Sequence, residues 1–287
     1  MRIVAFKRKD GPGLAVRRGE DLIDLAVAAP KLPRELAALL AVKGGLQAAK
    51  AAAKAAKAKA LVKGKITYLP TVAKPPKIIC VGLNYVDHAA ESPYKNAPTY
   101  PVLFNRFATT LIGHNAPMIR PHVSEQFDYE GELVAVIGRK GRYIAKDKAL
   151  SYVAGYTVFN DGSIRDYQFK STQWLMGKNF DATGPIGPDF VTPDELPAGA
   201  VGLQLTTRLN GQVVQNANTR DMIFDIATLV STASEAMTLE PGDLIVSGTP
   251  AGVGFARKPP LWMKDGDVCE VEIEGVGLLS NPIKDEK

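Results

Sequence analysis

Cysteine is scarce in this chain: only Cys80 and Cys269 occur among 287 residues. Two thiols are too few for the disulfide framework that holds many small secreted domains together, and a chain of this length can bury a sizeable hydrophobic core instead. The sequences around both cysteines suggest interior positions in strands. We therefore expect reduced thiols that pack in the interior, where a cysteine is usually inert.

Long apolar runs are also missing. No apolar stretch reaches the roughly 20 residues that a membrane-spanning helix needs, and residues 1–9 hold too short an apolar run for a secretory signal. The apolar content of 46% and the charged content of 23% are ordinary for a globular protein. We expect a cytoplasmic protein with no membrane partner.

Outside one segment, the chain lacks a large excess of positive or negative charge. The net charge of +5 and a pI near 9.0 invite a nucleic-acid interpretation. The excess, however, lies in one alanine-rich segment with Lys43, Lys50, Lys54, Lys57, Lys59, Lys63 and Lys65. This segment has no aromatic side chains for stacking on bases, so it is typical of an exposed helix with solvated lysines. We expect no nucleic-acid partner.

The first 74 residues predict a small N-terminal α/β domain. Apolar runs alternate with turn signals across residues 2–25, which indicates a meander of strands. Segments rich in alanine and leucine at 33–41 and 46–60 favour helices, and residues 66–69 favour another strand. Prolines follow at Pro70, Pro75 and Pro76, so we divide the chain into residues 1–74 and a main domain of residues 75–287.

The main domain is predicted to be α+β and rich in strands. Apolar runs bounded by turn residues indicate strands at 77–82, 101–106, 127–138, 153–159, 203–209, 212–214, 244–247 and 267–274. Asn210-Gly211 is a strong signal for a two-residue hairpin turn. Helices are expected at 88–91, where Ser92-Pro93 should end the helix, and at 163–168 and 221–237. The glycines and prolines of residues 184–188 predict a loop.

Glu130 and Glu132 lie two residues apart in one predicted strand, on either side of Gly131. Side chains at this spacing project from the same face. Two adjacent carboxylates repel each other, and burying them without a partner is costly or raises their pKa values. A bound cation removes that cost. The alternative is a solvent-exposed strand face that carries two solvated glutamates.

Asp161 follows the predicted strand at 153–159, at a point where its side chain can reach a shared site. Glu130, Glu132 and Asp161 would then offer three oxygen ligands with no cysteine nearby. Such a set suits Mg²⁺, Mn²⁺ or Ca²⁺ better than Zn²⁺. Three protein ligands on an octahedral ion leave positions open for water or for substrate oxygens.

His88 and Glu91 stand at positions i and i+3. In a helix the two side chains meet on one face, and a carboxylate beside an imidazole orients it for general-base chemistry. For an isolated His-x-x-Glu pair, an amphipathic turn with incidental polar residues is the simpler interpretation. His114 and His122 have no comparable neighbour, and we interpret both as structural or surface residues.

Six short motifs occur in an order that is specific as a set, although each is weak alone. They are Gly82-Leu83-Asn84-Tyr85 with His88 and Glu91; Asp128-Tyr129-Glu130-Gly131-Glu132-Leu133; Gly155-Tyr156-Thr157 with Asn160-Asp161, Arg165-Asp166 and Gln168; Gly177-Lys178; Asn210-Gly211; and Pro241-Gly242-Asp243 with residues 248–254. Across residues 77–283 the chain resembles the fumarylacetoacetate hydrolase family. The resemblance is to the bacterial branch with acylpyruvate hydrolases, oxaloacetate decarboxylases and 2-oxohept-3-ene-dioate isomerases.

This resemblance implies a mixed β-roll for the main domain, a homodimer, and Mg²⁺ or Mn²⁺ held by Glu130, Glu132 and Asp161. It also implies that His88 and Glu91 form a water-activating pair on a segment that becomes ordered over bound substrate. Lys178 would bind the substrate carboxylate or a developing oxyanion. Arg165, Gln168 and Thr249 would line the pocket.

Two positions depart from the pattern of the family. Gly162 stands where a larger apolar residue is usual, and Arg106 stands where lysine is common. We expect that neither touches the implied metal set, but that Arg106 could alter which acyl tail is accepted.

The expected reaction is metal-dependent hydrolysis of a C–C bond in a β-diketo acid of the acylpyruvate or fumarylpyruvate type. It would give an oxo acid and a carboxylic acid in the catabolism of small or aromatic-derived acids. Oxaloacetate-type decarboxylation, and isomerisation or hydration of a 2-oxo diacid, remain alternatives within the same metal-assisted enolate chemistry. A non-catalytic nucleic-acid binder that uses the lysine-rich helix is the alternative of another class, but it leaves the acidic cluster unexplained.

Overall fold

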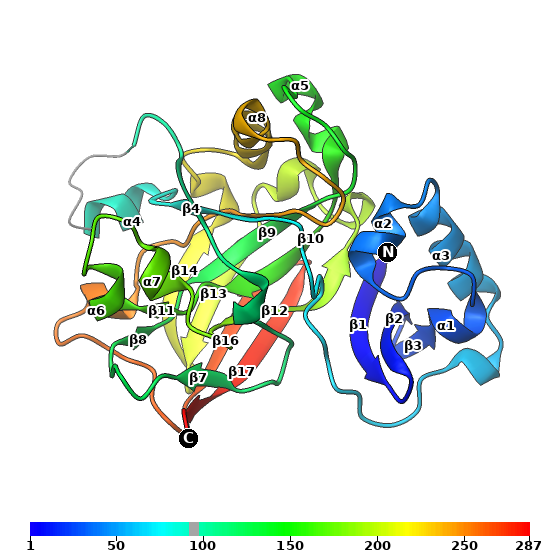
Figure 1. Ribbon diagram of the computed structural model, residues 1–287, viewed down its shortest axis with the longest axis horizontal. Helices are drawn as coiled ribbons and strands as arrows, with labels where there is room; N and C mark the ends of the chain where they lie inside the picture. Colours follow the sequence, from blue (N-terminus) through cyan, green and yellow to red (C-terminus); the bar gives the residue numbers. More distant parts are fainter. Residues whose placement is uncertain (92–97) are drawn as a thin grey trace.

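Strands dominate the fold, as the computed structural model shows for residues 1–91 and 98–287 (Figure 1). The predicted helix end at Ser92-Pro93 lies outside these described residues. The strands are β1 (Arg2–Arg8), β2 (Gly11–Arg18), β3 (Asp21–Asp24), β4 (Ile78–Gly82), β5 (Val102–Asn105), β6 (Leu111–Ile112), β7 (Met118–Arg120), β8 (Phe127–Asp128), β9 (Gly131–Ile137), β10 (Val153–Asn160), β11 (Ser163–Ile164), β12 (Gly184–Val191), β13 (Gln204–Leu209), β14 (Gln212–Asn218), β15 (Leu244–Val246), β16 (Val268–Ile273) and β17 (Gly277–Asp285).

Three sheets are formed by these strands. The ten-stranded sheet has the order β3-β2-β1-β12-β10-β9-β15-β4-β5, with β6 paired to β12. The five-stranded sheet has the order β14-β13-β16-β17-β7, and β11 pairs with β8 in a small third sheet. Because β15 runs parallel to β4 but antiparallel to β9, the large sheet is mixed. The predicted α+β, strand-rich fold is confirmed.

Helices lie around the sheets. They are α1 (Leu25–Ala28), α2 (Leu36–Ala41), α3 (Gly45–Ala55), α4 (Val86–Glu91), α5 (Lys146–Ala149), α6 (Arg165–Gln168), α7 (Leu175–Lys178) and α8 (Ile226–Ala236). The first three lie beside β1–β3, and α8 lies beside α5 on another side of the molecule (Figure 1). The short helices α4, α6 and α7 lie together in the view of Figure 1, and side chains from all three line one cavity.

Both faces of the central strand β9 are buried. Val134 and Val136 pack with the N-terminal strands and with α2 and α3. Leu133, Ala135 and Ile137, which point the other way, pack against the five-stranded sheet and α8. Period-two alternation therefore divides one strand between two cores, as expected for a strand covered on both sides.

The N-terminal region differs from the expectation in two places. The predicted helix at 46–60 ends at Ala55, because the chain then turns back and Val62 donates its N–H to the Leu22 carbonyl (2.9 Å). The strand predicted at 66–69 is wrong, since only an isolated bridge joins Tyr68 to Phe6. Because β1 pairs with β12, the N-terminal strands extend the large sheet, and the division at residue 74 stays a prediction.

The loop predicted at residues 184–188 is also wrong. These residues open β12, which lies between β1 and β10 in the large sheet. Ile186 is opposite Phe159, and Gly187 is opposite Val158, next to a shift in register. Glycine and proline disfavour strands locally, but partner strands on both sides and burial of the segment override that preference.

The predicted hairpin at Asn210-Gly211 is confirmed, since it joins β13 to β14. In β16, Cys269, Val271 and Ile273 are buried, whereas Glu272 is exposed, as the alternation predicts. Cys80 is likewise a buried free thiol. In the part of the chain that the structure covers, no helix has the length and apolar character needed to cross a bilayer.

Candidate active site

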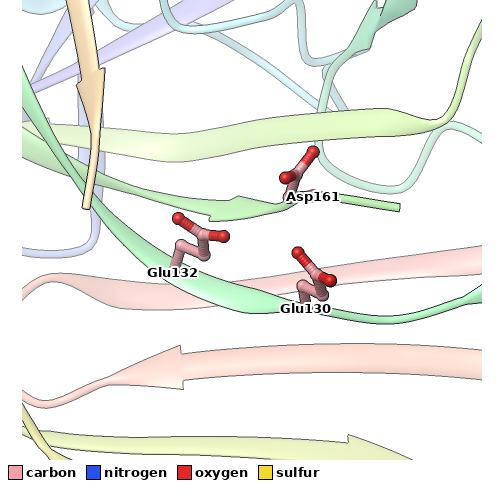
Figure 2. Close-up of side chains that lie close together, drawn as sticks. All are labelled: Glu130, Glu132 and Asp161. Atoms are coloured by element: carbon pink, nitrogen blue, oxygen red, sulfur yellow. The ribbon is translucent and has the colours of Figure 1, made fainter. Parts of the chain in front are cut away.

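Strand register brings the three predicted carboxylates together. β9 and β10 are antiparallel, with Asn160 opposite Gly131 and Phe159 opposite Glu132. Asp161, the residue that follows β10, donates its N–H to the Glu130 carbonyl (2.8 Å). Glu130, Glu132 and Asp161 therefore meet, and one carboxylate oxygen from each lies within 4.8 Å of the others. Figure 2 shows the two glutamate side chains pointing from one strand toward Asp161.

Gly131 separates the two glutamates because its other side has no room for a side chain. A Cβ atom at this position would overlap the Thr207 hydroxyl of β13 and come within 2.9 Å of Val271 of β16. The five-stranded sheet thus packs directly on the backbone here. The polar pair can face the opposite side only because this residue is glycine.

Lys178 lies against two of the three carboxylates. Its Nζ donates to Glu130 Oε2 (2.6 Å) and Asp161 Oδ2 (2.8 Å), and the lysine is 2% exposed. Burial lowers the pKa of Lys178, but the two carboxylates outweigh burial and raise it. The ammonium group is therefore charged, and it is held between Glu130 and Asp161 rather than pointing freely into the cavity.

Arg165 and Gln168 come from the single turn of α6. Arg165 donates from Nε to Asp128 (2.8 Å), lies 2.7 Å from Glu130 Oε1 through Nη2, and donates from Nη1 to Gln168 Oε1 (2.8 Å). Burial raises the pKa of Glu130, yet Lys178 and Arg165 outweigh burial and hold it well below its ordinary range. Glu130 is thus an ionised, doubly paired carboxylate.

Glu132 differs from its neighbours. It accepts a hydrogen bond from the Gly248 N–H (2.5 Å), but no described residue forms an ion pair with it, although it is 1% exposed. Burial raises the pKa of Glu132, and the charges of Asp161 and Glu130 raise it further. An ionised Glu132 needs an additional cation.

The donor set fits a hard divalent ion. The three carboxylates are buried, close together and without sulfur or imidazole ligands, which is the chemistry that Mg²⁺ and Mn²⁺ prefer. Lys178 neutralises part of the charge on Glu130 and Asp161, whereas Glu132 has no such compensation. Glu130, Glu132 and Asp161 could therefore hold a metal ion.

The His88–Glu91 pair forms on α4 as the spacing predicts. His88 Nδ1 lies 3.0 Å from Glu91 Oε1, and Glu91 also accepts from the Gly252 N–H (3.1 Å to each oxygen). Glu91 is therefore fixed by the loop after β15, and it fixes the imidazole in turn. His122 is exposed beside Glu286, and His114 accepts from the Ser280 N–H (3.1 Å).

The side chains of Thr249 and Arg106 both form hydrogen bonds within the protein, which their predicted roles in the pocket do not include. The Thr249 hydroxyl donates to the Gly131 carbonyl (3.0 Å) and accepts from Gln215 (2.8 Å), although Thr249 also lines the cavity. Arg106 is buried behind Asp161 and donates to its Oδ1 and to the Gly162 carbonyl (3.0 Å). The expectation that Arg106 does not touch the metal set is therefore wrong, since Asp161 belongs to that set. Since Arg106 is absent from the described cavity lining, the expectation that it influences the acyl tail is not supported by its position.

One cavity joins these groups. Its empty volume is about 550 Å³, part of which is open to solvent. Its polar lining includes both glutamates of the cluster together with the predicted catalytic and substrate-binding residues: His88, Glu91, Glu130, Glu132, Arg165, Gln168, Lys178 and Thr249. The remaining lining is largely apolar and aromatic.

Sequence reasoning missed several groups at this site. Asp128 is predicted only as part of a motif, yet it accepts from Arg165, from the Gly254 N–H (2.7 Å) and from the Phe255 N–H (2.9 Å). The available signal was its position two residues before Glu130, which places both side chains on one face if the strand continues through them. The aromatic lining gave no such signal, because its members come from segments far apart in the sequence.

Comparison with known proteins identifies relatives along the whole chain. Residues 77–284 match the profile of the fumarylacetoacetate (FAA) hydrolase C-terminal family. The oxaloacetate tautomerase fahd2 of Xenopus laevis, named as mitochondrial, is 41% identical over 99% of this chain and 90% of its own. Because that name includes a mitochondrial location, the expected cytoplasmic location stays a prediction.

Solved structures resemble the whole chain as well. The fumarylacetoacetate hydrolase of Exiguobacterium antarcticum superimposes with a TM-score of 0.85 at 32% identity, with full coverage of both chains. The maleylpyruvate hydrolase of Sphingobium sp. SYK-6 gives a TM-score of 0.81 at 28% identity, again with full coverage of both. The names of these relatives describe different reactions, so similarity alone does not select one.

Proposed function

This chain belongs to the fumarylacetoacetate hydrolase family, and we propose that it is an enzyme that interconverts the keto and enol forms of oxaloacetate. The observation that carries the proposal is the cluster of Glu130, Glu132 and Asp161 beside the buried ammonium of Lys178. A relative with 41% identity over 99% of the chain is named as an oxaloacetate tautomerase.

The acidic cluster and its cations would hold the oxo-acid end of the substrate. Mg²⁺ or Mn²⁺ bound to Glu130, Glu132 and Asp161 would act as a Lewis acid toward the substrate oxygens. Lys178 and Arg165 place two further positive charges at the cavity wall, where they favour negative charge that develops on the substrate as it enolises. Gln168, whose Oε1 is engaged by Arg165, retains its amide N–H groups for a substrate carboxylate.

His88 is the proposed proton carrier. Because Glu91 engages Nδ1, the second ring nitrogen, Nε2, is the one left to exchange a proton with substrate in the cavity. In enolisation the C3–H bond breaks, the proton passes to the imidazole, and its electron pair forms the C2–C3 double bond. The C2–O π electrons move to the oxygen, and the imidazolium passes its proton to that oxygen directly or through solvent. The reverse sequence restores the keto form.

A tautomer assay tests this function. The decay of the ultraviolet absorbance of enol-oxaloacetate should accelerate with Mn²⁺-loaded protein and return to the background rate with a chelator. Lys178→Met should slow it by about 10²–10³-fold, since one oxyanion-stabilising donor is worth that much. Lys148→Met, an exposed lysine on α5, is the matched control and should keep the full rate. No metal-dependent acceleration in folded wild-type protein would reject the proposal.

Hydrolysis of an acylpyruvate is a second candidate, favoured by the His88–Glu91 pair at 3.0 Å. Here His88 would take a proton from water as the oxygen attacks the distal carbonyl, the C–C bond would break, and the enolate of pyruvate would leave. The Sphingobium relative named as a maleylpyruvate hydrolase shares the fold. Pyruvate released from acetylpyruvate by the same Mn²⁺-loaded protein would support this candidate, and intact acetylpyruvate would exclude it for this substrate.

A further inference from the structure

Two pairs of aromatic rings line the cavity beyond its polar end. Phe104 and Trp174 meet edge to face with centroids 5.5 Å apart, and Phe169 and Phe255 lie with centroids 5.0 Å apart. All four rings belong to the cavity lining, although they come from β5, from the segment between α6 and α7, and from the loop after β15. We refer to these four rings as the aromatic compartment.

The compartment begins where the polar end stops. The Phe104 ring lies 5.2 Å from Lys178 Nζ, and the Phe255 ring lies 6.0 Å from the guanidinium carbon of Arg165. Each of these inner rings therefore touches one cation of the proposed oxo-acid site, at distances typical of cation–π contacts. Trp174 and Phe169 are the outer members of the two pairs, so the compartment extends the oxo-acid site rather than forming a separate cavity.

Trp174 is pressed against the end of β4. A Cβ atom at Gly82 would overlap two carbons of the indole ring, so this ring occupies the place that any other side chain at position 82 would take. The Trp174 carbonyl also accepts from the Lys178 N–H (3.2 Å). The indole is thus held on one side by β4 and on another by Phe104, which fixes the boundary of the compartment there.

The absence of charge on its four side chains indicates what the compartment binds. None of its four side chains is charged, and the two nearby cations are already paired with Asp128, Glu130 and Asp161. A carboxylate placed against these four rings would lose hydration and gain no hydrogen bond from them, which is unfavourable.

We propose that this compartment binds an uncharged, apolar tail carried by the 2-oxo acid, and that Trp174 and Phe169 contact that tail. The inference rests on the proposed function, because the oxo-acid end must bind at the acidic cluster for a tail to reach the rings. It extends the substrate class from oxaloacetate to 2-oxo acids with a hydrophobic substituent.

Two oxamates test the inference, since they share the carboxylate and adjacent carbonyl of a 2-oxo acid and differ only in the tail. Affinities of N-methyloxamate and N-benzyloxamate for the Mn²⁺-loaded protein are measured by calorimetry. The wild type should bind the benzyl compound about tenfold more tightly, the gain expected from burying one aromatic group. Trp174→Ala and Phe169→Ala should each reduce this preference by about threefold to tenfold.

Met176→Ala is the matched control. Met176 is 61% exposed on α7, two residues after Trp174, and it is absent from the described cavity lining. The benzyl preference should be unchanged in this variant. Equal affinities for the two oxamates in the wild type, or an unchanged preference in both Trp174→Ala and Phe169→Ala, would overturn the inference alone. Failure of both oxamates to bind would instead reject the oxo-acid site itself.

Discussion

At the scale of single residues, neighbours decide what a buried carboxylate can do. Asp128 is occupied by Arg165 and backbone N–H groups, and Glu130 is paired with both Lys178 and Arg165. Glu132 has the same chemistry as Glu130 but no ion-pair partner among the described residues. The difference follows from position alone, because the two glutamates are two residues apart on one strand. Glu132 is therefore the ligand that most needs a metal ion.

His88→Ala separates proton transfer from metal binding. The His88 imidazole lines the cavity, but the proposed metal ligands are the three carboxylates. The Mn²⁺ affinity of the variant, measured by calorimetry, should therefore change by less than about threefold. Turnover should fall by about 10²–10⁴-fold, the usual contribution of a general base. His122→Ala, at an exposed histidine, is the control and should keep full turnover. Unchanged turnover in His88→Ala would remove His88 from the mechanism.

At the scale of elements, tertiary contacts override several local preferences. β12 contains the glycines and prolines of a loop but lies between two strands, and α3 ends where the following chain returns to β3. By contrast, the helix predicted at 221–237 does form, as α8, but it begins at Ile226 because Asp225 caps it there. Asp225 is its N-cap and accepts from both the N–H (2.7 Å) and the hydroxyl (2.6 Å) of Thr228.

Asp225→Ala should destabilise the protein by about 1 kcal/mol at pH 7, the usual loss for an N-cap. Burial raises the pKa of Asp225, but the Thr228 hydroxyl and N–H outweigh burial and lower it below 3.8. A lowered folded pKa stabilises the fold above the unfolded pKa, and this contribution is lost as the pH falls through the folded value. The difference from wild type in urea unfolding should therefore shrink as the pH falls below 3.8.

Asp225→Asn is the matched variant, since asparagine keeps the side-chain acceptor. It should lose less stability at pH 7 than Asp225→Ala. A loss in Asp225→Ala that is the same at pH 7 and at low pH would show that the carboxylate charge does not contribute to the cap.

At the scale of the whole molecule, the acidic cluster lies where the sheets meet. Gly131 packs on β13 and β16, Asp161 follows β10, and the Gly248 N–H after β15 donates to Glu132. A metal ion bound here would hold several strands at once, and it would bind only to the folded arrangement. Metal binding should therefore stabilise the whole fold against global unfolding, rather than a single loop.

Mn²⁺ at about 100 times its dissociation constant should stabilise the protein by about 2.7 kcal/mol. The thermal midpoint should rise by roughly 5–10 °C, measured by calorimetry with and without chelator. Glu132→Gln should abolish most of this rise, whereas Glu235→Gln, at an exposed position on α8, should retain it. The same rise in Glu132→Gln as in wild type would exclude Glu132 as a ligand.

The sequence by itself determined the α+β class, the alternation of strands such as β16, the shared face of Glu130 and Glu132, and the helical spacing of His88 and Glu91. These features follow from local periodicity, which a sequence records directly. Only the tertiary structure decided that Lys178 lies between Glu130 and Asp161, that Arg106 faces Asp161 rather than the cavity, and that four distant rings line one compartment. Those contacts depend on strand order and sheet packing, and no local pattern encodes which distant segments meet.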